Sequence, residues 1–156
     1  MKWRIARNLG GILGTTGLFY LALHQLENSL LRDIVYPVAN ISFDHWIDKF
    51  NALGFIGLIV ALLSSLLWYI TAEWFLKINS SRRNSGRIIW AIIFFPPGIT
   101  AVGTMFLIPG TSSGLIFSAV LHVVNITLSY YLATALFSPS AFKYTPLLAK
   151  SLRRFW

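Results

Sequence analysis

Residues 53–70, LGFIGLIVALLSSLLWYI, decide the fold of this chain, because eighteen consecutive positions carry no charged side chain. An apolar helix of about 20 residues crosses the ~30 Å hydrocarbon core of a bilayer. Three more segments of similar character occur in the chain, so we expect four transmembrane helices, over residues 9–26, 52–76, 88–108 and 114–137. The sequence therefore predicts an all-α, polytopic membrane protein whose 156 residues form one four-helix domain.

The Lys and Arg residues are concentrated in three of the segments outside these helices. Eleven of the thirteen lie in residues 1–8, 77–87 and 138–156, whereas residues 27–51 combine Arg32 and Lys49 with four acidic residues. Short loops rich in Lys and Arg stay on the cytoplasmic side during insertion. We expect both termini in the cytoplasm of a bacterial cell, with the helices in its inner (plasma) membrane. The predicted connections are an external loop at 27–51, a cytoplasmic loop at 77–87 and a cytoplasmic tail at 138–156.

The net charge of +8 is compatible with binding to nucleic acid or to anionic lipid. The basic residues lie close to the helix ends, where a Lys or Arg gains about 1 kcal/mol from anionic headgroups. The chain leaves no soluble stretch long enough for a nucleic-acid-binding domain, so we expect lipid headgroups and no nucleic acid. The residues expected to contact headgroups or a soluble cytoplasmic partner are Arg82, Arg83, Lys150, Arg153 and Arg154.

The external loop contains a further helical pattern. Ser42 is a suitable N-cap, and Phe43, Trp46, Ile47 and Phe50 follow at i, i+3, i+4 and i+7 spacing. The pattern predicts a short external amphipathic helix on the outer leaflet, with Trp46 and Phe50 in contact with lipid. Docking of this helix on top of the bundle, or on a partner, would produce the same spacing.

Small residues form a stripe along each of the first two spans. Such stripes let two helix backbones approach closely in a membrane. We expect these spans to pack as a tight pair, with His24 hydrogen-bonded near the outer end of the seam. The helix-packing residues are Gly10, Gly14, Gly17 and His24 in the first span and Gly54, Gly57, Ala61 and Ser65 in the second.

Glu73 is an acidic residue within the second predicted span. It lies about one turn from the cytoplasmic end, and Lys77 follows four residues later in the favourable Glu-to-Lys order. We therefore expect a snorkelling ion pair between Glu73 and Lys77 in preference to a role in proton transfer.

The third span contains Pro96 and Pro97, followed by Gly98, Thr100 and Thr104. Two prolines remove two backbone donors from a helix, and hydrocarbon offers nothing to replace them. Two interpretations stay open. The first is a discontinuous helix of the kind that lines transport sites, and the second is a kink that serves packing.

The fourth span carries Ser118, His122, Asn125 and Ser129 within about 60° of helical arc. His122 is about 13 Å from the external end at helical rise, which is near the centre of a bilayer. Polar side chains at that depth point to a partner helix, a cavity or a cofactor. The stripe is interpreted either as an interhelical hydrogen-bond seam or, together with Pro96 and its neighbours, as a pore or substrate locus.

Catalytic and cofactor motifs are missing from the sequence. We find no Walker loop, HExxH pair or GxSxG elbow, and the absence of cysteine excludes disulfides and thiolate metal sites. A bis-histidine haem is disfavoured because His24 and His122 lie at different depths. We expect no enzyme activity, no cofactor and no metal site.

Two functions fit these features. The first is a homo-oligomeric channel, pore or small transporter subunit, whose polar locus would lie between spans three and four. A lone four-helix bundle fills its core with side chains, so a conduction path would lie between protomers. The alternative is a membrane anchor or sensor subunit that docks a soluble cytoplasmic partner, for example in a secretion, stress-response or antiviral defence system.

Overall fold

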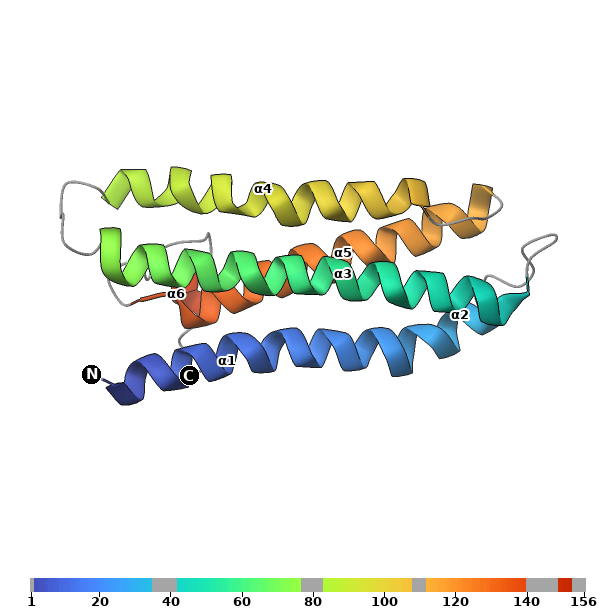
Figure 1. Ribbon diagram of the computed structural model, residues 1–156, viewed down its shortest axis with the longest axis horizontal. Coiled ribbons are helices and arrows are strands. Elements are labelled where there is room, and N and C mark those ends of the chain that lie inside the picture. The colour runs from blue at the N-terminus through green and yellow to red at the C-terminus, as the bar shows by residue number, and fades with distance from the viewer. Residues whose placement is uncertain (1, 35–41, 77–82, 108–111, 140–148, 153–156) are drawn as a thin grey trace.

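The structure is a computed structural model that describes residues 2–34, 42–76, 83–107, 112–139 and 149–152 (Figure 1). Within these ranges the chain is all-helical. Helix α1 continues into a π-helical segment, η1, and then into α2, and α3 continues into a second π-helical segment, η2. The bounds are α1 Lys2–Leu21, η1 Ala22–Glu27, α2 Asn28–Ile34, α3 Phe43–Ile70, η2 Thr71–Leu76, α4 Arg83–Leu107, α5 Ser112–Phe137 and α6 Ala149–Leu152.

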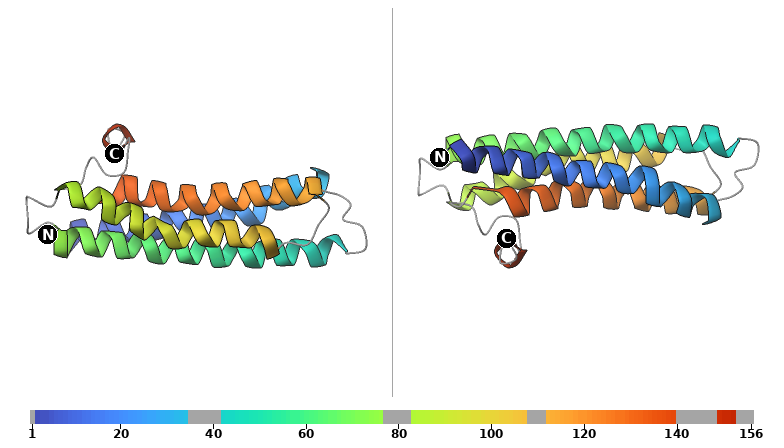
Figure 2. Two further views of the ribbon diagram at one scale, coloured as in Figure 1. Left: turned by 90° about the horizontal axis from the view of Figure 1, so that it is seen from above. Right: turned by 90° about the horizontal axis from the view of Figure 1, so that it is seen from below.

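The four long helices run up and down along one axis. Helices α3 and α5 pack against each other, and each of them also packs against α1 and α4. Helices α1 and α4 lie on opposite sides of this central pair (Figure 1). The start of α1, the end of η2, the start of α4 and the end of α5 all lie at one end of the bundle (Figure 2). The short α6 packs against α5.

Three helices among the described residues are long and apolar enough to cross a membrane: Phe43–Leu76, Ser85–Thr104 and Ile116–Phe137. They correspond to the second, third and fourth predicted spans. The first helix is not among them, because its glycines and threonines and its basic start lower its hydropathy. The expectation of four apolar helices is therefore met for three.

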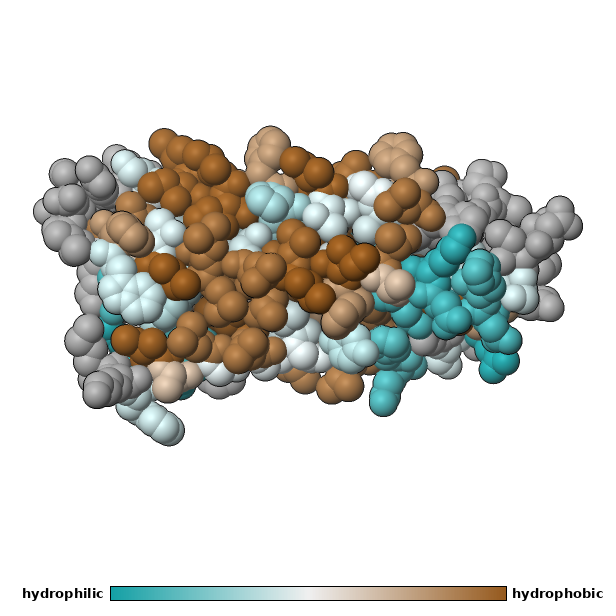
Figure 3. Space-filling view, viewed as in Figure 1, coloured by the Kyte–Doolittle hydropathy of each residue, from teal (hydrophilic) through white to brown (hydrophobic). Residues whose placement is uncertain are grey.

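Apolar side chains cover the outside of the bundle while many polar ones are buried inside it. Figure 3 shows the apolar belt, with hydrophilic residues gathered toward the end where α2 and α3 begin. Soluble monomers rarely expose apolar patches of more than a few hundred Å². The exposed apolar residues include Leu13 and Leu18 on α1, Leu63 and Leu67 on α3, Ile92 and Ile99 on α4, and Ile116 and Val120 on α5.

The predicted external amphipathic helix is the first part of α3. Ser42 is its N-cap and accepts a hydrogen bond from the backbone N–H of His45 at 3.4 Å, as the sequence indicates. Helix α3 then continues to Ile70 without a break. Trp46 and Phe50 are fully buried against Leu23 and Leu31, so the expectation that they contact lipid is wrong. The same spacing arises because this turn docks on η1 and α2.

The glycine contacts differ from the predicted pair of spans. Gly10, Gly14 and Gly17 are exposed, and a Cβ added to any of them would meet nothing within 4 Å. The expectation that they pack α1 against α3 is wrong, because α1 is rotated so that Gly11 faces inward instead. A Cβ on Gly11 would overlap the Phe137 ring of α5.

The small-residue face of α3 is buried and packs mainly against α5. A Cβ on Gly57 would overlap Ile126, and one on Gly54 would lie 2.8 Å from Leu23 and 3.2 Å from His122. Ala61 is buried in a cluster that also contains Ile126. Ser65 is buried and donates a hydrogen bond to the backbone carbonyl of Ala61, within its own helix.

Glu73 forms an ion pair that the sequence did not indicate. Arg4 of α1 approaches the Glu73 carboxylate of η2 at 2.9 Å, and the Glu73 side chain is only 2% exposed. The antiparallel arrangement of α1 and α3 brings the start of one helix beside the end of the other. Lys77, the predicted partner, lies outside the described residues.

Adjacent glycines provide a test of this helix rotation. Gly11→Ala should destabilise the protein by about 1–3 kcal/mol because the new methyl group overlaps Phe137. Gly10→Ala should be neutral or stabilising by up to about 1 kcal/mol, since alanine favours helix and the site is open. Denaturant-induced unfolding in mixed micelles measures both. Equal effects of the two substitutions would contradict the assigned rotation of α1.

Candidate functional site

The polar stripe of the fourth span lies inside the bundle. Ser118, His122, Asn125 and Ser129 are all buried on α5, which, like α3, contacts the three other long helices. Helix α5 is apolar over most of its length, so these four residues stand out from a hydrophobic background. The structure therefore brings them together on one inner face, as their spacing indicates.

His122 joins α5 to the beginning of α3. Its Nε2 lies 3.0 Å from the backbone carbonyl oxygen of Phe50, and the two rings lie with centroids 4.2 Å apart. A carbonyl oxygen only accepts, so Nε2 carries the proton and Nδ1 keeps its lone pair. Among the described residues, Nδ1 has no hydrogen-bond partner. Gly54 makes the contact accessible, because any side chain there would crowd the imidazole.

Three further hydrogen bonds join the second half of α5, and Ser138 just after it, to neighbouring helices. The indole N–H of Trp90 donates to Thr134 Oγ1 at 3.0 Å, and the Tyr130 hydroxyl donates to the Trp90 carbonyl at 3.1 Å. The indole N–H of Trp68 donates to Ser138 Oγ at 2.7 Å. Sequence reasoning missed this part of the seam. The available signal was that an indole N–H inside a membrane-spanning bundle needs an acceptor. Trp68 and Trp90 both lie in predicted spans.

The proline pair does not interrupt the third helix. Helix α4 is continuous from Arg83 to Leu107 and contains Pro96, which is exposed, and Pro97, which is buried. Thr100 donates to the Pro96 carbonyl at 2.9 Å, and Thr104 donates to the Ala101 carbonyl at 2.8 Å. Both hydroxyls are therefore used within α4. The structure therefore contradicts a discontinuous helix.

The histidine of the predicted polar locus packs against α3, whereas the proline pair belongs to α4. His122 points to Phe50 and Gly54 of α3. The contact between α5 and α4 combines the two hydrogen bonds of Trp90 with an apolar cluster. This cluster contains Ala61, Ala101, Ile126 and Tyr130, with Trp90, Ile93, Phe94 and Val123 packed against it.

Large aromatic side chains pack in the core of the single chain. Among the described residues, the largest fully buried side chains are those of Trp46, Trp68, Tyr69, Tyr130 and Phe50. In the part of the chain that the structure describes, no group of three or more His, Asp or Glu residues is placed to hold a metal ion. The site is thus a hydrogen-bonded seam between helices, and His122 Nδ1 and Ser129 Oγ of the stripe have no hydrogen-bond partner among the described residues.

Several predicted contact residues fall outside this description. Arg82, Arg153 and Arg154 are not among the described residues, and the side chains of Arg83 and Lys150 are likewise not described. His24 is half-buried in η1, where its ring meets Tyr20 edge-on with centroids 4.5 Å apart.

The fold and the seam define a class: an all-helical bundle with three helices long and apolar enough to span a membrane. Comparisons of the chain with protein-family models, curated proteins and solved structures give no match. The function must therefore be argued from the geometry of this chain.

The Trp90–Thr134 contact provides a test of the seam. Thr134→Val keeps the shape of the side chain but leaves the Trp90 N–H without its acceptor, so stability should fall by about 1 kcal/mol. Thr127→Val is the matched control, because Thr127 donates only to backbone carbonyls of its own helix. Unfolding in mixed micelles gives both values. A loss of stability no larger than that of Thr127→Val would show that the Trp90–Thr134 hydrogen bond does not stabilise the fold.

Proposed function

We propose that this chain is a multi-pass integral membrane protein that crosses the bilayer four times. The observation that supports this is the distribution of its side chains. Large apolar residues are exposed along all four long helices, while serine, threonine, asparagine and histidine are buried. Exposing such a surface to water costs free energy, whereas contact with the hydrocarbon core of a bilayer does not.

The fourth crossing is assigned to α1, which is less apolar than the others. Helix α1 runs on through η1 and α2 to Ile34, which is long enough to span a bilayer. It packs along both α3 and α5 and exposes Leu13, Leu18 and Leu21 on its outer side. A helix packed along two membrane-spanning neighbours crosses the membrane with them.

The orientation is inferred from charge at the two ends of the bundle. Arg4, Arg7 and Arg87 lie at the end that holds the start of α1 and of α4. Asp44 and Asp48 are exposed at the opposite end, where α3 begins. The positive-inside rule places the arginine end, and with it both termini, in the cytoplasm of a bacterial cell.

Reporter fusions test this orientation. A reporter that is active only outside the inner membrane should be active when fused after Asn40 and inactive when fused after Ser81, because these positions are expected on opposite sides. Alkaline phosphatase activity in whole cells, normalised to protein level, is the measurement. Activity after Ser81 would refute the orientation.

Within the membrane, we assign the protein the role of an anchor or sensor subunit that docks a soluble cytoplasmic partner. The filled core supports this role, because bulky aromatic side chains occupy the interior of the single chain. Arg4, Arg7 and Arg87 lie at one end of the bundle, and the sequence assigns eleven of the thirteen Lys and Arg residues to segments expected in the cytoplasm. That end offers a positive surface to a partner of acidic character.

A homo-oligomeric channel or small transporter subunit is the second candidate. It is favoured by the buried polar column of α5, which includes His122 with its unpartnered Nδ1. Because the core of one chain is filled, a path would lie between copies.

Reversing the charge of the basic tail tests whether a cytoplasmic partner docks there. Replacing Lys150, Arg153 and Arg154 together by Glu should abolish co-purification of a stoichiometric cytoplasmic partner, because like charges then meet. Lys49→Glu, at the opposite end, should leave it unchanged. Retention of the partner after charge reversal would contradict docking at the tail.

Flux measurements address the channel. Purified protein in liposomes should conduct no ions or small solutes if the anchor role holds, and His122→Leu should then change nothing. Conductance that is lost in His122→Leu would overturn the anchor role in favour of the channel.

A further inference from the structure

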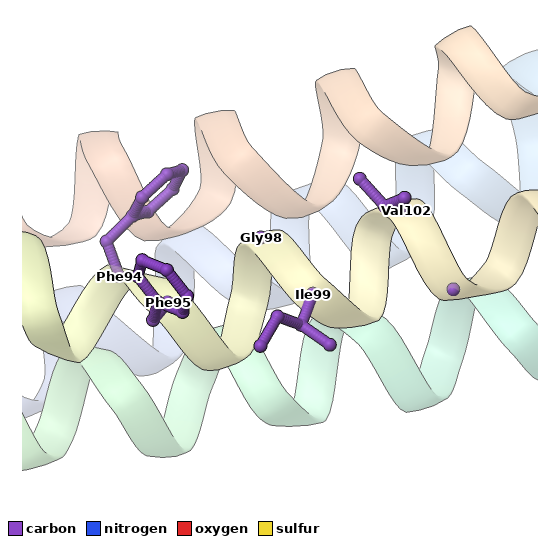
Figure 4. A pocket seen from close by; sticks show the side chains of 6 residues that line it. Phe94, Phe95, Gly98, Ile99 and Val102 are labelled. Atoms are coloured by element: carbon purple, nitrogen blue, oxygen red, sulfur yellow. The ribbon is translucent and has the colours of Figure 1, made fainter.

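A groove of about 540 Å³ runs along the outer face of α4. Six residues line it, and Figure 4 shows Phe94 and Val102 on one side of the helix, Ile99 on the other, and Gly98 between them. Gly98 and Gly103 create the hollow. A Cβ on Gly103 would meet nothing within 4 Å, and one on Gly98 would meet only Phe94, at 3.7 Å. The lining residues are Phe94, Phe95, Gly98, Ile99, Val102 and Gly103.

One wall of the groove is held in place by the packed side of the bundle. The Phe94 ring stacks on Trp90, with centroids 6.0 Å apart and planes 8° from parallel, and lies 5.5 Å from the Tyr130 ring. Trp90 is in turn fixed by its hydrogen bonds with Thr134 and Tyr130. The hollow is therefore formed by the fold itself.

Arg87 lies on the same face of α4, toward the basic end of the bundle. It is exposed and precedes Gly98 by eleven residues, which on a helix is a displacement of about 16 Å along the axis and about 20° around it. Ala91, small and exposed, lies between them and leaves the path open. The face thus combines a cation at one end with a purely apolar hollow one leaflet's depth away, since half of a ~30 Å hydrocarbon core is ~15 Å.

We propose that this face of α4 binds an anionic glycerophospholipid of the cytoplasmic leaflet lengthwise. The lipid phosphate pairs with the Arg87 guanidinium, and one acyl chain passes Ala91 and fills the groove between Phe94 and Ile99. A glycerophospholipid carries its anionic phosphate about one leaflet's depth from the end of its acyl chain. One molecule can therefore contact both Arg87 and the hollow. This site rests on the proposed membrane insertion.

The absence of cysteine in the chain allows single labels to be introduced. Ile99→Cys places a bimane fluorophore in the groove, and Val124→Cys places one on exposed α5. The Trp90–Thr134 hydrogen bond sets the register of the antiparallel helices and puts these positions at similar depth. The labelled proteins are reconstituted in phosphatidylcholine vesicles that contain phosphatidylglycerol or phosphatidylcholine spin-labelled at carbon 12 of one chain.

At Ile99→Cys, the phosphatidylglycerol probe should associate about five-fold more strongly than the phosphatidylcholine probe, as expected for one added charge contact. The preference should disappear with Arg87→Gln and persist with Arg7→Gln, an exposed arginine on α1 at the same end. Gly98→Leu, which fills the hollow, should weaken quenching by both probes. At Val124→Cys the two probes should quench equally.

Other results overturn the site. Equal quenching by both headgroups at Ile99→Cys, or a preference unaffected by Arg87→Gln, would exclude it while leaving membrane insertion intact. Disulfide-linked dimers of unlabelled Ile99→Cys would place a second copy in the groove instead of a lipid. No quenching at either position would overturn the membrane insertion itself, and the lipid site with it.

Discussion

Hydrogen bonds between helices determine how this bundle packs, and most of those found among the described residues involve α5 or Ser138, which follows it. His122 bonds to the backbone of α3, Thr134 accepts from Trp90 of α4, and Ser138 accepts from Trp68 of α3. An apolar exterior offers no competing donors or acceptors, so each of these bonds also selects a rotation and a depth for the helix that it reaches. The central position of α5 follows from this role.

Close backbone approach is the second condition, and glycine provides it at defined points. Gly54 and Gly57 let α5 side chains approach the α3 backbone, and Gly54 gives His122 its access to the Phe50 carbonyl. Gly11 does the same for Phe137 on the side of α1. The glycines on the outer faces of α1 and α4 have no such partner among the described residues. On α4 they leave the hollow that we assign to a lipid chain.

Several features could be predicted from the sequence, because each depends on the composition or periodicity of a single segment. The apolar stretches of the second, third and fourth spans correspond to α3, α4 and α5, and Ser42 caps α3 as its position before an apolar periodic run indicates. The alignment of Ser118, His122, Asn125 and Ser129 also follows directly from helical periodicity, and all four are buried. Other expectations failed because helical periodicity identifies an apolar face but not what covers it. The spacing of Trp46 and Phe50 fits contact with lipid as well as contact with protein, and the tertiary structure places both residues against η1 and α2.

By itself, the sequence determined the helical character of the chain, its three most apolar helices and the asymmetry of its charge, because these depend on composition and periodicity along one segment. Tertiary structure alone decided which faces meet. Because the outward faces of these helices also carry apolar side chains, hydropathy does not set the rotation about the axis. Shape and hydrogen-bond partners from distant segments set it instead. Gly11 therefore faces inward while Gly10 faces outward, and Arg4 of α1 forms an ion pair with Glu73, which lies 69 positions later in the sequence.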